Sequence, residues 1–577
     1  MNFRFFSFFA FAGMMLIGCG GEAPAATPEP VRPASELADS IFSGGDIVTI
    51  DSAQPQVEAV AVKDGRILAL GTRAEIEGKY RGDATRMFDL AGRTLLPGFI
   101  DGHSHVSQAL GLVGWANVSI PPVGQVESIG GLIEALRAHA MSSAAAPGDW
   151  ILAYGYDADG LEEKRHITRD DLDAAFPDNP VLLLHVSGHG MVLNSAGLAL
   201  AGIDANTPTP EGGVIVRKPG SLEPAGLLME AAAMPVYRVL PQPDAAQQLA
   251  ALDTVQKEYA RNGYTTIQDG ATDVAHLRMF QTAARQGALW LDLVALPLVM
   301  TPADLETQLA NSFGSYEGRL KLGGIKVLSD GSPQGRTAYF SEAMLVEGPD
   351  GEQDWHGVPF ISEPDYQKVF RAAYEQGVPV WTHANGDAAI DMVIRAHELL
   401  DASPADERRD VVIHSQFVRP DQLDSYAQLG IGASFFTNHA YYWGDVHVRN
   451  LGQKRAFFLS PMKSAQQRGI HFSNHSDYAV TPLNPAMMLW SAVARESRSG
   501  VVIGPEERVS PLRALESLTI DAAWLYHEED SKGSISPGKL ADFVVMDANP
   551  LTVPAPALRE LEVEAMVKEG VVVYGEI

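Results

Sequence analysis

The chain has 577 residues, of which 46% are hydrophobic and 20% charged, an ordinary globular composition in a chain too long for one simple core. It carries 72 acidic against 43 basic residues, a formal net charge of −29 at pH 7. Such a surface repels phosphate backbones, which argues against nucleic-acid binding.

The N-terminus has the pattern of a signal peptide over residues 1–18: a basic start at Arg4, a short apolar run and small residues. The apolar run is too short to span a membrane comfortably. The only cysteine, Cys19, ends the stretch "LIGC", which resembles the bacterial lipobox, where cleavage precedes a lipidated cysteine. Residues 19–40 are rich in Pro, Ala and Gly and indicate a flexible tether. We therefore expect an exported lipoprotein, anchored to a bacterial membrane and facing the periplasm or the cell exterior. An ordinary cleaved signal with an incidental cysteine is the alternative.

The two ends of the remaining chain share one character. Residues 41–95 and 535–577 consist of short apolar stretches broken by turns such as Asp64-Gly65. They predict a small composite β-sandwich domain built from both ends. The intervening residues 96–534 then form an insertion in that domain.

This middle part alternates apolar strands with helical stretches, which is typical of βα units and a parallel sheet. Candidate strands lie at 94–101, 264–270, 291–299, 320–330, 378–383, 410–415, 431–436 and 470–477. Eight such units predict an α/β fold of the (β/α)8 TIM-barrel class. The gap between the first and second strands is too long for one helix, so about 106–250 should hold an inserted subdomain.

Polar side chains follow five of these strands at the ends where barrels carry their active sites. His103 and His105 follow the first strand and, being two residues apart, project to the same side of an extended chain. The other members of the set are Lys326, His383, His414 and Asp477. Imidazole and carboxylate groups are suitable ligands for zinc and similar divalent ions.

With the stretches "GIKVLSDGSPQGRTA", "THANGDAAI", "SFFTNHAYYWGD" and "HSD", this pattern resembles the amidohydrolase superfamily of metal-dependent hydrolases. The narrower resemblance is to amidohydrolase family 3, which includes N-substituted formamide deformylase-like enzymes. It implies that His103, His105 and Asp477 hold one metal ion and that His383 and His414 hold a second. Lys326, carboxylated on its amine, would bridge the two. The implied cofactor is one or two divalent ions, with zinc favoured.

Each of these residues also has a structural alternative. The His-x-His pair can face solvent, and Lys326 can extend its amine to the surface. His383 and His414 can be hydrogen-bonded core histidines, and Asp477 can cap the following helix.

Two further groups are candidates for substrate binding. His189 and Asn194, in "SGHGMVLNSAGL", resemble a family stretch of the inserted subdomain, with a structural loop as the alternative. His439, Tyr442 and Trp443 follow the seventh strand and are expected to line the pocket or simply to pack.

For three other polar residues the sequence predicts no role in catalysis. Asp330 and Arg336, after the fourth strand, are expected to form an internal ion pair. His475 is left unassigned.

The expected activity is metal-dependent hydrolysis of an amide-like C–N bond in a small molecule. Metal-activated water attacks the carbonyl, while Asp477 accepts its proton and passes it to the leaving amine. Deamination, peptide cleavage and ester or lactone hydrolysis remain open on the same scaffold. A non-catalytic periplasmic binding lipoprotein is the alternative of another class, and homo-oligomerisation is left open.

Overall fold

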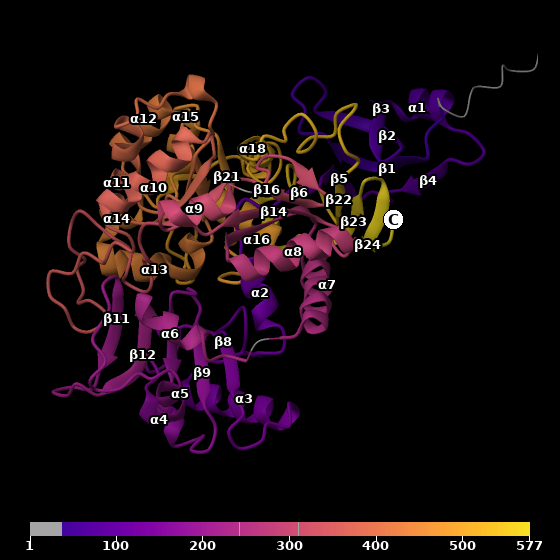
Figure 1. Ribbon diagram of the computed structural model, residues 1–577. Helices are drawn as coiled ribbons and strands as arrows, with labels where there is room; N and C mark the ends of the chain where they lie inside the picture. The colour runs from indigo at the N-terminus through magenta and orange to yellow at the C-terminus, as the bar shows by residue number, and fades with distance from the viewer. Residues whose placement is uncertain (1–36, 242, 310) are drawn as a thin grey trace, which may run out of the picture.

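The computed structural model describes residues 37–241, 243–309 and 311–577 (Figure 1). The expected leader, Cys19 and most of the expected tether lie outside the described residues. Within the described ranges, no helix combines the length and the apolar character needed to cross a membrane.

Eight parallel strands form the barrel. They are β6 (Phe99–Ile100), β13 (Tyr264–Thr272), β14 (Asp292–Pro297), β17 (Ile325–Leu328), β18 (Val380–Ala384), β19 (Val411–His414), β20 (Gly432–Phe435) and β21 (Phe472–Asn474). They pair as two arcs, β6–β13–β14 and β17 to β21, and a parallel bridge between Leu298 and Lys326 joins the arcs. At the other junction, the carbonyls of Ser517 and Leu518 accept the N–H groups of Asn474 and Ile100. The short β6 and β21 are thus tied together by a third segment.

The expected fourth strand at 320–330 is divided in two. β16 (Leu320–Leu322) pairs with β14, whereas β17 pairs with β18. Gly323 and Gly324 separate them: Gly324 has a φ of 148°, and a Cβ there would lie 2.5 Å from the carbonyl oxygen of Pro379. Only glycine accommodates this approach.

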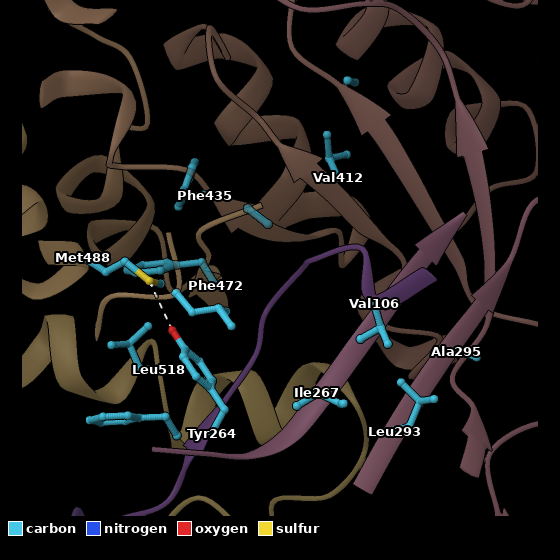
Figure 2. Close-up of a cluster of buried hydrophobic side chains, with 14 of the residues drawn as sticks. Val106, Tyr264, Ile267, Leu293, Ala295, Val412, Phe435, Phe472, Met488 and Leu518 are labelled. Carbon is cyan, nitrogen blue, oxygen red and sulfur yellow. Dashed lines mark hydrogen bonds between the residues drawn. The ribbon is translucent and has the colours of Figure 1, made fainter. Parts of the chain in front are cut away.

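Helices with one apolar face cover the barrel strands. The main ones are α7 (Ala245–Arg261), α8 (Val274–Gln286), α9 (Pro302–Gln308), α10 (Glu363–Glu375), α11 (Asp387–Glu398), α12 (Pro420–Leu429), α13 (His439–Leu451), α15 (Met462–Gln467) and α16 (Pro485–Ala494). Side-chain caps start several of them; Asp244, for example, accepts the Gln247 N–H at the start of α7. Figure 2 shows part of the core between strands and helices, where the Tyr264 hydroxyl lies 3.3 Å from the sulfur of Met488.

The segment after β6 builds a second layered unit, seen at the bottom of Figure 1. Its sheet has the order β11-β12-β10-β9-β8-β7. The strands are β7 (Ala116–Asn117), β8 (Ile151–Tyr156), β9 (Val181–His185), β10 (Gly190–Leu193), β11 (Gly213–Arg217) and β12 (Pro224–Glu230). Helices α3 (Ile129–Ser142), α4 (Arg169–Asp173) and α5 (Ser195–Leu200) pack with it, and the unit has its own buried clusters. We call this unit the inserted subdomain.

Strands from the two ends of the chain share one eight-stranded sheet, drawn in indigo and yellow in Figure 1. Its strands are β1 (Ser40–Val48), β2 (Gln56–Lys63), β3 (Arg66–Gly71), β4 (Arg86–Asp89), β5 (Thr94–Pro97), β22 (Phe543–Met546), β23 (Val563–Lys568) and β24 (Val571–Gly575). β5 lies between β1 and β22 and so joins the two ends. A buried cluster drawn from both ends forms the core of this terminal sheet.

A buried group of charges attaches the terminal sheet to the barrel. Asp292, at the start of β14, lies 2.7 Å from Lys568 of β23, 2.9 Å from Lys532 and 2.8 Å from Arg319. Both lysines are buried, and each also contacts another carboxylate. Attraction to the lysines outweighs burial and holds the pKa of Asp292 below its usual range.

Candidate metal centre

Five of the six expected ligands lie at or just after the carboxyl ends of barrel strands, and the sixth lies within a strand. His103 and His105 follow β6, Lys326 lies within β17, and Asp477 follows β21. The other two, His383 and His414, lie at the ends of β18 and β19. His414 and Asp477 have φ values of 70° and 53°, a conformation that non-glycine residues rarely adopt and that clusters at functional sites.

Four of these side chains form one group of facing atoms. The Oδ1 atom of Asp477 lies 3.2 Å from His105 Nε2 and 3.5 Å from His103 Nε2. The Lys326 amine lies 3.0 Å from the same His103 Nε2. A carboxylate oxygen, two imidazole nitrogens and an amine thus point at one small volume.

The two remaining histidines form a second group beside the first. His414 Nε2 lies 3.0 Å from His383 Nδ1. The other ring nitrogen of His414 is buried without a hydrogen-bond partner and lies 3.9 Å from Asp477 Oδ2. Potential ligand atoms of His103, His414 and Asp477 all lie within 4.8 Å of one another. A buried nitrogen left unpaired among histidines and a carboxylate fits a divalent cation such as zinc.

Outer hydrogen bonds orient the histidines of the pair. His103 Nδ1 lies 2.5 Å from Gln268 Oε1, and His105 Nδ1 lies 2.6 Å from the carbonyl oxygen of Gly270. Both acceptors belong to β13. They fix the Nδ1–H tautomer, so that Nε2 of each ring faces the centre with its lone pair, as is usual for metal-binding histidines.

Burial and neighbouring charges set the protonation of the centre. Burial lowers the pKa of Lys326 to about 7, and burial together with Lys326 holds the pKa of His103 well below its usual range. Burial alone would raise the pKa of Asp477, but the adjacent histidines outweigh it and hold that pKa well below its usual range. Neutral imidazoles and an ionised carboxylate are the forms that bind metal.

The inserted subdomain brings one of its two candidates to this centre. The His189 ring lies 5.1 Å from the His383 ring, measured between centroids. Asn194 is not brought there: its Oδ1 accepts the N–H groups of Val181 and Gly197, and its Nδ2 donates to the carbonyls of Phe176 and Asn179. Its amide is fully used in capping α5 and joining loops of the subdomain.

The aromatic cluster on α13 lies against both units. The His439 ring packs between Phe436 and Trp443, and its Nδ1 lies 3.0 Å from His447 Nε2. The indole N–H of Trp443 donates to the buried carboxylate of Asp157 in the inserted subdomain, at 3.0 Å. Trp443 therefore ties α13 to that subdomain.

The expected ion pair between Asp330 and Arg336 is wrong. Asp330 is fully buried and accepts the N–H groups of Tyr339, Asn385 and Gly386, while burial raises its pKa to about 7. Arg336 instead donates to the carbonyl of Glu347. The donors come from two loops, after β17 and after β18, and Asp330 Oδ1 also lies 3.4 Å from His383 Nε2, so the carboxylate is held beside the centre without Arg336.

Sequence reasoning missed three residues around the centre. Gln268 orients His103, and Glu230 of β12 lies 2.8 Å from His189 Nδ1. His475 was left unassigned, yet its ring lies 5.3 Å from that of His103 and 5.0 Å from that of His414. Its place in the same "HSD" stretch as Asp477 was the available signal.

Comparisons with known proteins identify relatives that match most of the chain. A family model described as the amidohydrolase family matches residues 86–574. The N-substituted formamide deformylase of Arthrobacter pascens is 29% identical over 553 residues, which cover 94% of this chain and 99% of the relative. Protein LONG AFTER FAR-RED 3 of Arabidopsis thaliana is 30% identical over 535 residues, covering 90% and 88%.

Solved structures confirm the fold. An uncharacterized metal-dependent hydrolase from Pyrococcus horikoshii superposes with a TM-score of 0.69 at 21% identity, covering 90% of this chain and 99% of its own. Atrazine chlorohydrolase TrzN from Arthrobacter aurescens, solved with zinc, gives 0.52 at 14% identity, covering 93% and 95%. The expected TIM-barrel class is thus confirmed, and so is the resemblance drawn from the sequence motifs. The chain belongs to the amidohydrolase family.

Proposed function

We propose that the protein hydrolyses an amide-like C–N bond of a small molecule at a site formed by His103, His105, Lys326, His383, His414 and Asp477. The observation that carries the proposal is the convergence of buried imidazole nitrogens on one carboxylate, Asp477, with a His414 nitrogen left unpaired. Relatives of the same family include an enzyme named for removing formyl groups from substituted nitrogen. An amide carbonyl is therefore the substrate group we favour.

A divalent cation bound there would supply Lewis acidity toward the carbonyl and lower the pKa of water to about 7. The chain itself supplies the proton path. Asp477, ionised and 3.2 Å from His105, is the base that accepts the proton of the attacking water. It then returns that proton to the leaving nitrogen, so that the amine departs neutral.

Lys326 has a separate part in the proposal. Burial lowers its pKa to about 7, so much of the amine is neutral at physiological pH. A neutral amine can react with carbon dioxide to form a carbamate, which is an oxygen ligand. Carboxylated Lys326 would lie between the His103 group and the His383–His414 pair.

Location is a second proposal, carried by the sequence alone. Cys19 and its leader indicate an exported protein held at a bacterial membrane by lipid. Mass spectrometry of the mature N-terminus from membrane fractions tests it, and an unmodified Cys19 inside a longer mature chain would refute it.

A hydrolysis screen tests the function. N-formyl amines, N-acyl amino acids and cyclic amides are incubated with purified protein, with and without a chelator, and the Asp477→Asn variant serves as the control. We expect turnover of at least one amide class that the chelator and the variant both abolish. Turnover that survives both treatments would contradict the proposed site.

A further inference from the structure

The inserted subdomain carries a carboxylate–histidine pair that the proposed mechanism does not use. Glu230 Oε2 lies 2.8 Å from His189 Nδ1, and the Glu230 N–H donates to the His189 carbonyl at 2.9 Å. Glu230 is only 6% exposed and ends β12, whose partner strand β10 begins directly after His189. The two residues are therefore held together through both backbone and side chain.

The barrel holds the other oxygen of the same carboxylate. Thr337, in the loop after β17, donates its hydroxyl to Glu230 Oε1 at 2.6 Å. Gly331 in that loop leaves the necessary space, because a Cβ there would collide with Glu230 Oε1 and with the Thr337 hydroxyl. The same loop also contacts the candidate metal centre, because the Gly331 carbonyl oxygen lies 3.3 Å from His383 Nε2.

The backbone of Glu230 is strained. Its φ of 51° and ψ of −127° lie outside the regions that residues with a side chain normally occupy. Such conformations cost on the order of 1–3 kcal/mol and persist where the surroundings impose them, often at functional sites. Here the strain directs the carboxylate inward, to His189 and Thr337.

The pair leaves one nitrogen of His189 available. Nδ1 is engaged by Glu230, so Nε2 is the nitrogen left to contact a bound molecule. The ring lies beside that of His383, and the carboxylates of Asp477 and Asp330 lie near enough to influence it electrostatically. A carboxylate behind a histidine fixes its tautomer and its orientation.

We propose that Glu230 is a positioning residue: it holds His189 so that Nε2 hydrogen-bonds the scissile amide bound beside His383. The inference rests on the proposed amide hydrolysis. If it is correct, a residue of the inserted subdomain, His189, contacts the reacting group of the substrate directly.

The first test compares kinetic constants of matched variants on an amide that the wild type hydrolyses. Glu230→Gln keeps the shape but removes the charge, and Glu223→Gln makes the same change at a more exposed carboxylate of the same subdomain, which pairs with Arg169 and Lys218. We expect Glu230→Gln to lower kcat about tenfold or more, as loss of outer-shell partners does elsewhere, with KM changed little. His189→Gln should be at least as damaging, and the double variant no worse than His189→Gln alone. A kcat for Glu230→Gln equal to that of Glu223→Gln would overturn the proposal.

The second test needs no turnover. Proton NMR of the resting protein labelled with 15N-histidine should contain a low-field ring proton from the His189–Glu230 hydrogen bond, assigned by its absence in His189→Gln. We expect it to persist in Glu223→Gln and to be lost or moved upfield in Glu230→Gln. If the signal is unchanged in Glu230→Gln, the positioning role is wrong even if the amidase activity is confirmed. If the signal behaves as expected but no amide is hydrolysed, the proposed function fails. The hydrogen bond between His189 and Glu230 is then confirmed, but the proposed contact of His189 with an amide is overturned.

Discussion

Replacing Asp292 by asparagine should destabilise the junction between the barrel and the terminal sheet. Asparagine has nearly the same shape, but it removes the negative charge that Lys568, Lys532 and Arg319 share. It also turns an NH2 group toward one of these cations. Because the two lysines are buried, solvent cannot replace the lost partner.

The expected loss of stability can be estimated because the ion pairs of Asp292 with the two lysines are buried. Removing one partner of a buried ion pair typically costs about 3–5 kcal/mol. With an unfolding entropy of about 2 cal/mol/K per residue, 577 residues correspond to about 1.2 kcal/mol/K for cooperative unfolding. The melting temperature should therefore fall by about 3–4 °C.

Differential scanning calorimetry at neutral pH measures this shift. Asp424→Asn is the matched control, because its partner Arg468 forms an exposed pair of the kind that contributes about 0–1 kcal/mol. The pKa of Asp292 is depressed in the folded state, so its stabilisation is present at neutral pH and is lost as the pH falls below about 4. The difference from wild type should shrink on acidification. Equal melting temperatures for Asp292→Asn and Asp424→Asn at pH 7 would refute the reasoning.

Four further outcomes are expected. Asp477→Asn should lower kcat about 10²- to 10⁴-fold, the usual contribution of a general base, with the fold intact by circular dichroism. Lys326→Met should reduce metal content, measured by elemental analysis, if the lysine is a bridging ligand; unchanged content would remove it from the site. Trp443→Phe leaves the buried Asp157 carboxylate short of a donor and should cost about 1–3 kcal/mol, visible as a lower melting temperature. Cys19→Ser should move the protein from the membrane fraction to the soluble fraction, and continued membrane attachment would contradict the lipid anchor.

The barrel and the histidines at its strand ends were predictable because both leave local patterns. Apolar runs bounded by turn residues mark strands, and parallel strands gather their ends on one face. His383 and His414 could be placed together for that reason, before any contact was known. The division at Gly323–Gly324 was not predictable from the apolar pattern, because the run continues on both sides of it.

The outer contacts of the centre could not be predicted, because they depend on pairing between distant segments. Glu230 meets His189 only through the antiparallel pairing of β12 with β10, and Gln268 of β13 meets His103 through the pairing of β13 with β6. For Asp330 and Arg336, in contrast, the sequence predicted a contact that the structure does not contain. Opposite charges close in sequence suggested an ion pair, yet backbone N–H groups of Tyr339 and of the distant Asn385 meet the carboxylate instead.

Metal content of the purified protein is the most direct test of the central claim. Elemental analysis after purification with added divalent metal should find one or two equivalents per chain, with zinc favoured, and His103→Asn combined with His414→Asn should remove it. The imidazole groups and the carboxylate of Asp477 would then be ligands, as their convergence predicts. Less than about 0.1 equivalent in the wild type would contradict the account.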